Sequence, residues 1–322
     1  MCCCYQALKG IREATGNDAL WVYDPGQGST NTARYAIHGQ GPAPSLSSFV
    51  AFTDITGTVG AILDRDGYIT AVLPASGLTP TVIRAAWNGS STAWVSSGTS
   101  SLDWRAYNLS GTLQGTATVS DSATVNRYSC ACDSSGNLVA FNSSTGNLER
   151  WTPSGTLASS VLLFSALGAR PLCVDGSDNI IVMNGSVIDK YDTSMSRTMR
   201  VSYPFGVTPI SLVADSGGNF FMVGHQGNTA RLYRYTSSGT LDWTVTLSYQ
   251  ALSDTFKDLW CDGSNVYLAY YRSFIGTYRQ KYNSSGSQVW SDTVWFDDNN
   301  LRTINSLRGD GSVVVYAGAR GG

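Results

Sequence analysis

The sequence holds few residues suited to acid–base or metal chemistry. It has only two histidines, His38 and His225, so a histidine pair or a multi-histidine metal site is disfavoured. Both lie in glycine-containing segments, HGQG and GHQG, and we interpret them as ordinary turn residues. No nucleophile elbow, phosphate-binding loop or HExxH motif occurs.

Paired carboxylates are the usual catalytic groups of glycoside hydrolysis, which makes the aspartates candidate catalytic residues. Five of them begin a repeated turn, whereas a catalytic acid is needed once. The candidates outside the repeat are Asp297 and Asp298 in WFDDNN and Asp64 and Asp66 in DRDG. DRDG could begin a calcium site, but the later ligands of an EF-type loop are absent. We therefore predict that the protein is not an enzyme and has no catalytic residue, cofactor or metal.

The cysteines number seven, and an odd count excludes a complete internal disulfide framework unless one thiol stays free or pairs between chains. Cys132 and Cys261 directly precede a repeated aspartate, and Cys173 lies two residues before another. We interpret them as small buried residues of an inner strand. Cys130 and Cys132 share one face of a strand, so a metal or disulfide pair there is the alternative.

The N-terminal residues combine adjacent thiols with a short amphipathic pattern. Exposed adjacent thiols are a liability, so we expect an intermolecular disulfide, a metal or burial against a partner. The following YQALKGIREAT predicts a short helix with an apolar stripe. The predicted partner-docking residues of this arm are Cys2, Cys3, Cys4, Tyr5, Leu8 and Ile11.

A tight-turn motif that begins with Asp recurs along the chain. It starts at Asn88 as a variant and continues at Asp133, Asp175, Asp215, Asp262 and Asp310, in steps of 45, 42, 40, 47 and 48 residues. An aspartate side chain can bond the backbone two residues on, and Gly or Asn tolerates positive φ. These segments therefore predict hairpin turns between short apolar strands.

A second motif, an aromatic residue followed by a Ser-Gly turn, keeps the same phase. Its copies start at Tyr107, Trp151, Tyr235 and Tyr282, with a degenerate copy at Tyr191. Together the motifs predict four strands in a repeat of about 40–50 residues, the length of a propeller blade.

The repeats predict an all-β fold: a closed, seven-bladed β-propeller of four-stranded antiparallel blades, with six or eight blades as alternatives. Residues 45–80 are the least regular and would form one shortened blade. Residues 19–24 and 33–39 would supply the third and fourth strands of a blade that the N- and C-terminal strands share. The helical docking arm would cover residues 1–16 and the propeller domain residues 17–322.

The segments from Gly239 to Trp243 and from Gly286 to Trp290 resemble the repeats of quinoprotein-like propellers, in which the Trp docks between blades. The Asp-x-x-Gly-Asn turn followed by an apolar strand also resembles NHL-type repeats. This resemblance implies architecture over nearly the whole chain. The quinone- and metal-binding residues of the dehydrogenases in that superfamily have no counterpart here, and propellers host many functions.

The overall charge argues against two classes of partner. The formal net charge is -2 and 14% of residues are charged, which gives no footprint for nucleic acid or an anionic membrane. The first residues contain no secretory signal, and no apolar run is long enough for membrane insertion. A surface rich in hydroxyl and amide groups, with few Lys and Glu, is common outside cells and on virus particles. We therefore predict a virion or extracellular-facing location without a classical signal peptide.

These observations predict a non-enzymatic structural or binding subunit of a large assembly, with a phage particle (tail, baseplate or capsid decoration) as the best candidate. Its partners would be other subunits of a multiprotein assembly, such as virion proteins, and host-surface glycans. The alternative is a carbohydrate-binding or carbohydrate-cleaving propeller, because the 9 Trp and 17 Tyr could stack on sugars. A cytoplasmic scaffold is disfavoured by the surface composition.

Overall fold

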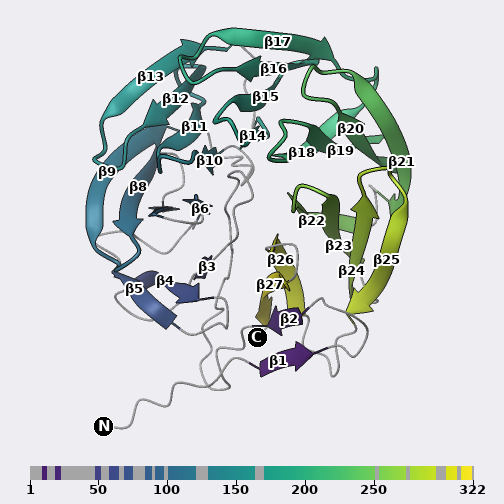
Figure 1. The fold of residues 1–322 in the computed structure, drawn as a ribbon, viewed down its shortest axis with the longest axis horizontal. Coiled ribbons are helices and arrows are strands. Elements are labelled where there is room, and N and C mark those ends of the chain that lie inside the picture. Colours follow the sequence, from purple (N-terminus) through teal and green to yellow (C-terminus); the bar gives the residue numbers. More distant parts are fainter. Residues whose placement is uncertain are drawn as a thin grey trace.

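In the computed structural model, the described residues form strands and turns. They are residues 9–12, 19–22, 48–51, 58–64, 69–74, 84–88, 91–97, 101–120, 130–163, 170–250, 254–272, 276–294, 302–309 and 313–320. None of these ranges contains a helix, and so none contains a helix able to cross a membrane. Figure 1 shows small sheets arranged around a common centre.

Five sheets each contain four antiparallel strands in sequence order. The first comprises β6 (Arg84–Trp87), β7 (Thr92–Ser97), β8 (Ser101–Asn108) and β9 (Leu113–Ser120). The second comprises β10 (Cys130–Cys132), β11 (Leu138–Asn142), β12 (Asn147–Trp151) and β13 (Leu157–Leu162). The third comprises β14 (Leu172–Val174), β15 (Ile180–Asn184), β16 (Val187–Tyr191) and β17 (Arg197–Ser202).

The remaining two of these sheets follow directly along the chain. One comprises β18 (Thr208–Ala214), β19 (Phe220–Gln226), β20 (Thr229–Tyr235) and β21 (Leu241–Gln250). The other comprises β22 (Asp254–Cys261), β23 (Asn265–Arg272), β24 (Gly276–Asn283) and β25 (Gln288–Val294). The first strand of each sheet lies nearest the centre and the last lies outermost, as β14 and β17 illustrate in Figure 1.

Two further sheets differ from this pattern. A three-stranded sheet of β3 (Ser48–Ala51), β4 (Thr58–Asp64) and β5 (Ile69–Pro74) occupies the region where a shortened blade was expected. The terminal sheet has the order β1 (Lys9–Arg12), β2 (Ala19–Val22), β27 (Val313–Arg320) and β26 (Arg302–Gly309). The two ends of the chain therefore share one sheet, as the sequence predicted.

The terminal sheet corrects three details of that prediction. Strand β2 is the third strand as expected, but it pairs with β27 in parallel, with Ala19 opposite Val313. The described fourth strand is β1, and residues 33–39 lie outside the described residues. The predicted helical arm is wrong over residues 9–12, where Ile11 lies in β1 opposite Leu20. Gly10 disfavours a helix there. Pairing with β2 supplies the backbone of this short segment with hydrogen-bond partners, whereas a short isolated helix is only marginally stable in water.

The strand directions define two faces of this arrangement of sheets around a common centre. Successive strands run in opposite directions, so the turns after the first and third strands of a sheet lie on one face, which we call the turn face. The turns after the second strand and the connections between sheets lie on the other, which we call the loop face. Both sequence motifs therefore lie on the turn face.

Apolar clusters fill the space between neighbouring sheets. Val139 and Leu148 of one sheet pack with Val174 and Ile180 of the next, and all are fully buried or nearly so. Every residue of the inner strands β11 and β15 is buried, whereas the outer strands β13 and β17 alternate between exposed and half-buried residues. Continuous apolar runs therefore mark inner strands that are covered on both sides.

The glycine of the Ser-Gly turn is required for two reasons. Gly286 has a φ of +82°, which favours glycine. A Cβ at this position would also lie 3.0 Å from the Trp243 ring of the preceding sheet. Trp243 Nε1 donates a hydrogen bond to Ser284 O at 2.9 Å. The docking of Trp243 between sheets, which the family resemblance implied, is therefore confirmed.

Candidate functional site on the turn face

The repeated aspartates form their own turns. Asp133 Oδ1 accepts hydrogen bonds from the N–H groups of Ser135 at 3.0 Å and Asn137 at 2.9 Å, and Oδ2 accepts one from Asn137 Nδ2 at 2.9 Å. Similar bonds to the turn Asn recur at Asp175, Asp215 and Asp262. The predicted turn-forming role is confirmed at these positions, and it explains why the residue type repeats.

The Ser-Gly turns use polar side chains in the same way. Asn283 Oδ1 accepts hydrogen bonds from the N–H groups of Ser285 at 3.1 Å and Ser287 at 2.9 Å, and from the Ser285 hydroxyl at 2.7 Å. Asn108 and Asp192 accept corresponding bonds in their own sheets. These side chains stabilise turns, as Asx residues commonly do.

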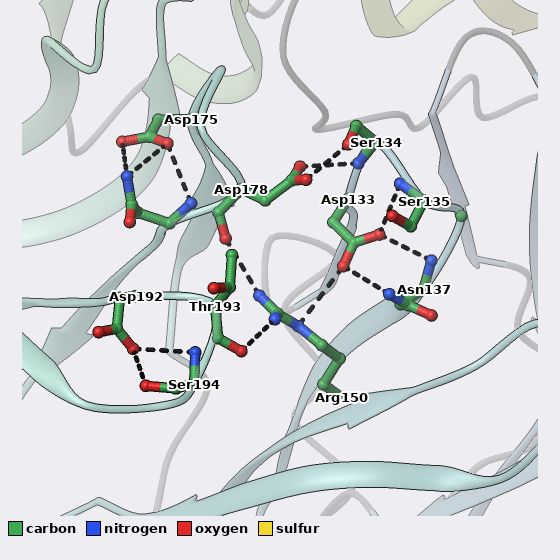
Figure 2. A network of polar contacts seen from close by, with 12 residues as sticks. Asp133, Ser134, Ser135, Asn137, Arg150, Asp175, Asp178, Asp192, Thr193 and Ser194 are labelled. Carbon is green, nitrogen blue, oxygen red and sulfur yellow. Dashed lines mark hydrogen bonds and ion pairs between the residues drawn. The ribbon is translucent and has the colours of Figure 1, made fainter.

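Arg150 of β12 connects its sheet to the next one (Figure 2). Its Nη1 donates to Thr193 O at 2.6 Å and its Nη2 to Asp178 O at 3.0 Å. Its Nε lies 3.4 Å from Asp133 Oδ2, and the side chains of Arg150 and Asp133 are only 7% and 3% exposed. One buried guanidinium therefore binds a carboxylate of its own sheet and both turns of the neighbouring sheet.

Asp178 crosses the same junction in the opposite direction. Its carboxylate accepts hydrogen bonds from the N–H group of Ser134 at 2.8 Å and from the Ser134 hydroxyl at 2.5 Å. Asp178 has a φ of 61°, where the corresponding turns carry Gly136 and Gly218. Asp tolerates this left-handed region better than most residues do. The two bonds across the junction offset the remaining backbone cost.

The basic residues of this face were not predicted from the sequence. A basic residue directly precedes the aromatic residue at Arg150-Trp151, Lys190-Tyr191, Arg234-Tyr235 and Lys281-Tyr282. Lys190 Nζ lies 2.7 Å from Asp175 Oδ2, Arg234 forms an ion pair with Asp242, and Lys281 lies over the ring of Tyr267. This basic–aromatic dipeptide recurs together with the aromatic motif. The sequence therefore contained a signal that could have identified these basic residues.

Burial controls the ionisation of the inner residues on this face. It raises the pKa of Asp133 above its ordinary value, although hydrogen bonds from Asn137 and the charge of Arg150 act in the opposite direction. Burial also raises the pKa of the Cys132 and Cys173 thiols well above the ordinary value. Protonated, buried thiols are poor nucleophiles. The Cys132 and Cys173 thiols are therefore suited to packing between strands and not to nucleophilic attack.

A second buried cluster surrounds Asp189 in the same junction. Arg200 Nε and Nη2 both donate to Asp189 at 2.7 Å, and Asn184 Nδ2 also donates at 2.7 Å. Arg170 donates to Asn184 Oδ1 and lies 4.9 Å from the ring centroid of Phe141 in the preceding sheet. Burial alone would raise the pKa of Asp189, but these bonds outweigh it and lower that pKa. Asp189 is therefore ionised at neutral pH and is unsuited to act as a general acid.

The structure places only some of the predicted docking residues. Ile11 lies in β1, and the others, Cys2, Cys3, Cys4, Tyr5 and Leu8, lie outside the described residues. Their docking role stays a prediction.

The remaining chemical candidates do not come together in the described residues. His38, Asp66, Asp297 and Asp298 lie outside them, and Asp64 ends strand β4. The interpretation of His225 as a turn residue is wrong, because His225 lies in strand β19 opposite Thr208 of β18 and the turn begins only at Gly227. Over the described ranges, no cluster of three or more His, Cys, Asp or Glu side chains could hold a metal ion.

Cys132, Cys173 and Cys261 are buried in their strands, which confirms their interpretation as small core residues, and Cys130 is buried as well. Cys261 Sγ also donates to Ala214 O of the preceding sheet at 3.0 Å.

Comparison with protein-family models and with curated proteins finds no match. Several solved structures share the fold. A streptogramin B lyase structure is 10% identical over 88% of this chain and 92% of its own, with a TM-score of 0.62. Virginiamycin B lyase from Staphylococcus aureus is 10% identical over 98% of each chain, with a TM-score of 0.60. A catalytically inactive variant of that lyase with quinupristin is 12% identical over 97% of this chain and 96% of its own, with a TM-score of 0.60.

These likenesses identify an all-β fold of the propeller type. They also correct the prediction that the protein is not an enzyme, because the proteins with this fold include lyases. That prediction rested on scarce histidines and repeated aspartates. Function belongs to particular sites on a fold, so neither observation excludes catalysis.

Proposed function

We propose that this chain is a ring-shaped binding subunit of a large multiprotein assembly, with its rim as the contact surface. The observation that carries this proposal is a repeated exposed leucine. Leu113, Leu157 and Leu241 are 39%, 44% and 43% exposed. Each begins the outermost strand of its sheet, opposite the aromatic residue of the third strand.

The repetition distinguishes these leucines from scattered surface residues. Single exposed apolar side chains are normal on soluble proteins, whereas the same position on three of the five antiparallel four-stranded sheets gives a partner a repeated contact. In β17 and β25 the corresponding residues are Arg197, opposite Tyr191, and Gln288, opposite Tyr282. The rim therefore has three apolar positions, with a basic and an amide side chain at the other two.

A phage particle is the assembly we favour, with a virion or extracellular-facing location. The support is compositional, because only 14% of the residues are charged and the surface depends on hydroxyl and amide groups for solubility. We further propose that the seven described sheets are the seven blades of a closed ring. A two-dimensional class average of the purified protein should show seven-fold pseudosymmetry, and six or eight blades would refute this count.

The assembly proposal is tested with a rim variant in which Leu113, Leu157 and Leu241 are replaced by Ser. Mass spectrometry of purified particles from the source organism should find the wild-type chain in stoichiometric copies. The rim variant should fold with an almost unchanged unfolding midpoint and should fail to incorporate. A monodisperse monomer absent from particles, or full incorporation of the variant, would refute the proposal.

A second candidate is a catalytic propeller, favoured by the similarity to virginiamycin B lyase over nearly the whole chain. Incubation of the purified protein with quinupristin, followed by mass spectrometry, tests this directly. A product of altered mass would support the candidate. Unchanged quinupristin at an enzyme concentration equal to that of the compound would remove this substrate from consideration.

A further inference from the structure

The connection between β17 and β18 holds an aromatic ring in solvent on the loop face. Phe205 is 97% exposed, the largest value among the exposed large hydrophobic residues. Within the described part of the chain, it is the one such residue between Leu162 and Leu241. A Phe side chain this exposed forgoes the gain of burial that favours folding.

The backbone that carries Phe205 is rigidly held. Val207 N–H donates to Pro204 O at 3.3 Å, and Gly206 has a φ of +77°, so the segment is a type II turn with Phe205 in its first central position. Gln226 Nε2 donates to Phe205 O at 2.9 Å, and Tyr203 hydroxyl donates to Gly185 O at 2.6 Å. These bonds tie the turn to hairpins on both sides, so the backbone that presents the ring is already ordered before a ligand binds.

The neighbouring turns are polar and uncharged. The hairpin that contains Gln226 also holds the exposed residues Gly227, Asn228 and Thr229. The hairpin whose Gly185 carbonyl accepts the bond from Tyr203 holds the exposed residues Gly185 and Ser186. Amide and hydroxyl groups thus surround the aromatic ring. These turns contain no cationic side chain, so they offer a phosphate or other anion no ion pair and no charge-assisted hydrogen bond from a side chain.

A protein partner is also disfavoured at this position. Stable protein interfaces bury about 800 Å² on each partner around a cluster of apolar or aromatic anchors. Among the described residues between Leu162 and Leu241, Phe205 is the one exposed large apolar side chain. A ligand that covers a single ring and exchanges hydrogen bonds with amides and hydroxyls fits better. The C–H face and hydroxyl groups of a neutral sugar have this chemistry.

We propose that the turn Pro204–Val207, together with the hairpin turn around Gly227, is a binding site for a neutral saccharide, with Phe205 as its stacking platform. The proposal is independent of rim assembly, because Phe205 lies on the loop face whereas the rim leucines directly follow turns of the turn face. A shallow site with one platform should bind weakly, with a Kd on the order of millimolar.

The test is a neutral-glycan array followed by saturation-transfer NMR with the glycans that bind. Wild-type protein should bind at least one uncharged glycan. Phe205→Ala should weaken that binding at least about tenfold, whereas Phe205→Trp should retain it because the platform remains. Leu162→Ala is the matched control, since Leu162 is 69% exposed at the end of β13, and it should leave binding unchanged.

Three results of the sugar-binding test would overturn the proposal. They are an array with no neutral ligand, binding that survives Phe205→Ala, and binding restricted to sulfated or sialylated glycans. Phe205-dependent capture of a deglycosylated protein without sugar binding would also refute it in favour of a protein site. The serine rim variant should retain sugar binding, so failure of the assembly proposal remains distinguishable. All variants should share the wild-type unfolding midpoint, because Phe205 and Leu162 are exposed.

Discussion

Two junctions between sheets use different chemistry on the same backbone frame. The polar junction joins the β10–β13 and β14–β17 sheets, and there Arg150 and Asp178 cross the turn face. The aromatic junction joins the β18–β21 and β22–β25 sheets, and there Trp243 packs against Phe221 and the turn at Ser284. Both also contain apolar clusters.

The comparison separates the requirements of the repeat from those of each junction. The turns and inner strands set the spacing of the sheets. Either hydrogen bonds or a packed aromatic ring can then join neighbouring sheets at the turn face. A buried ion pair depends on protonation and on every partner being present. Ring packing depends mainly on shape and area.

The largest expected effect is at the polar junction. Arg150→Met should lower the free energy of unfolding by about 3–5 kcal/mol, because it leaves the buried Asp133 without its cation and removes the donor to two carbonyls. Urea unfolding measures this. Arg105→Met is the control, since Arg105 is half-buried and donates to the carbonyl of its neighbour Trp104. Equal losses in both variants would show that the crossing contributes nothing specific.

At the aromatic junction we expect a slightly smaller effect. Trp243→Ala should cost about 3 kcal/mol, because it leaves a void beneath Gly286 and beside Phe221. Trp243→Phe should cost about 1 kcal/mol, since it keeps most of the ring and loses the bond from Nε1 to Ser284 O. If both variants lose the same amount in urea unfolding, the hydrogen bond and not the ring packing dominates this junction.

The two junctions should also differ in their response to pH. The lowered pKa of Asp189 means that the folded state binds its proton less tightly than the unfolded state does. Its contribution is therefore present above the unfolded value of about 3.9 and is lost as the pH falls through the lowered folded pKa.

Asp189→Asn should accordingly lose about 1–2 kcal/mol at pH 7, a figure that allows for solvent screening of the one-third exposed Arg200. That loss should shrink as the pH falls from 5 to 3. Unfolding midpoints of both proteins across this range provide the measurement. The deficit of Trp243→Ala should stay constant, and a parallel decline there would argue against a local cause.

The smallest effect concerns the backbone of Asp178. Asp178→Ala and Asp178→Gly both remove the hydrogen bonds from Ser134, but only Gly relieves the left-handed conformation. The Gly variant should therefore be more stable than the Ala variant by about 1 kcal/mol. Thermal unfolding resolves this difference. Identical stabilities would mean that the turn changes conformation when the bonds are removed.

The local features of the fold were predictable from residue types. Asp133 and Gly286 occur in motifs whose turns follow from side-chain hydrogen bonding and positive φ. The apolar runs around Cys132 and Cys261 predicted inner strands. The shared terminal sheet followed from the phase of the motifs. Each of these depends on contacts within a few residues or on the period of the repeat.

Other features depended on residues that are distant in the sequence. The sequence predicted a helix around Ile11, but pairing of β1 with β2 decided otherwise, and the parallel register of β2 with β27 has no local signal. The basic-aromatic dipeptide was visible, yet the bonds of Arg150 depend on where the next sheet lies.

The same division holds for the candidate surfaces. Residue types alone predicted a repeated all-β chain whose aspartates make turns, because those propensities act through neighbouring atoms. They did not show that Phe205 would stand exposed while Tyr233 and Tyr235 of the following sheet are buried, or that leucines would recur on the rim. Solvent exposure is set by how whole sheets pack, and only the tertiary structure determines it.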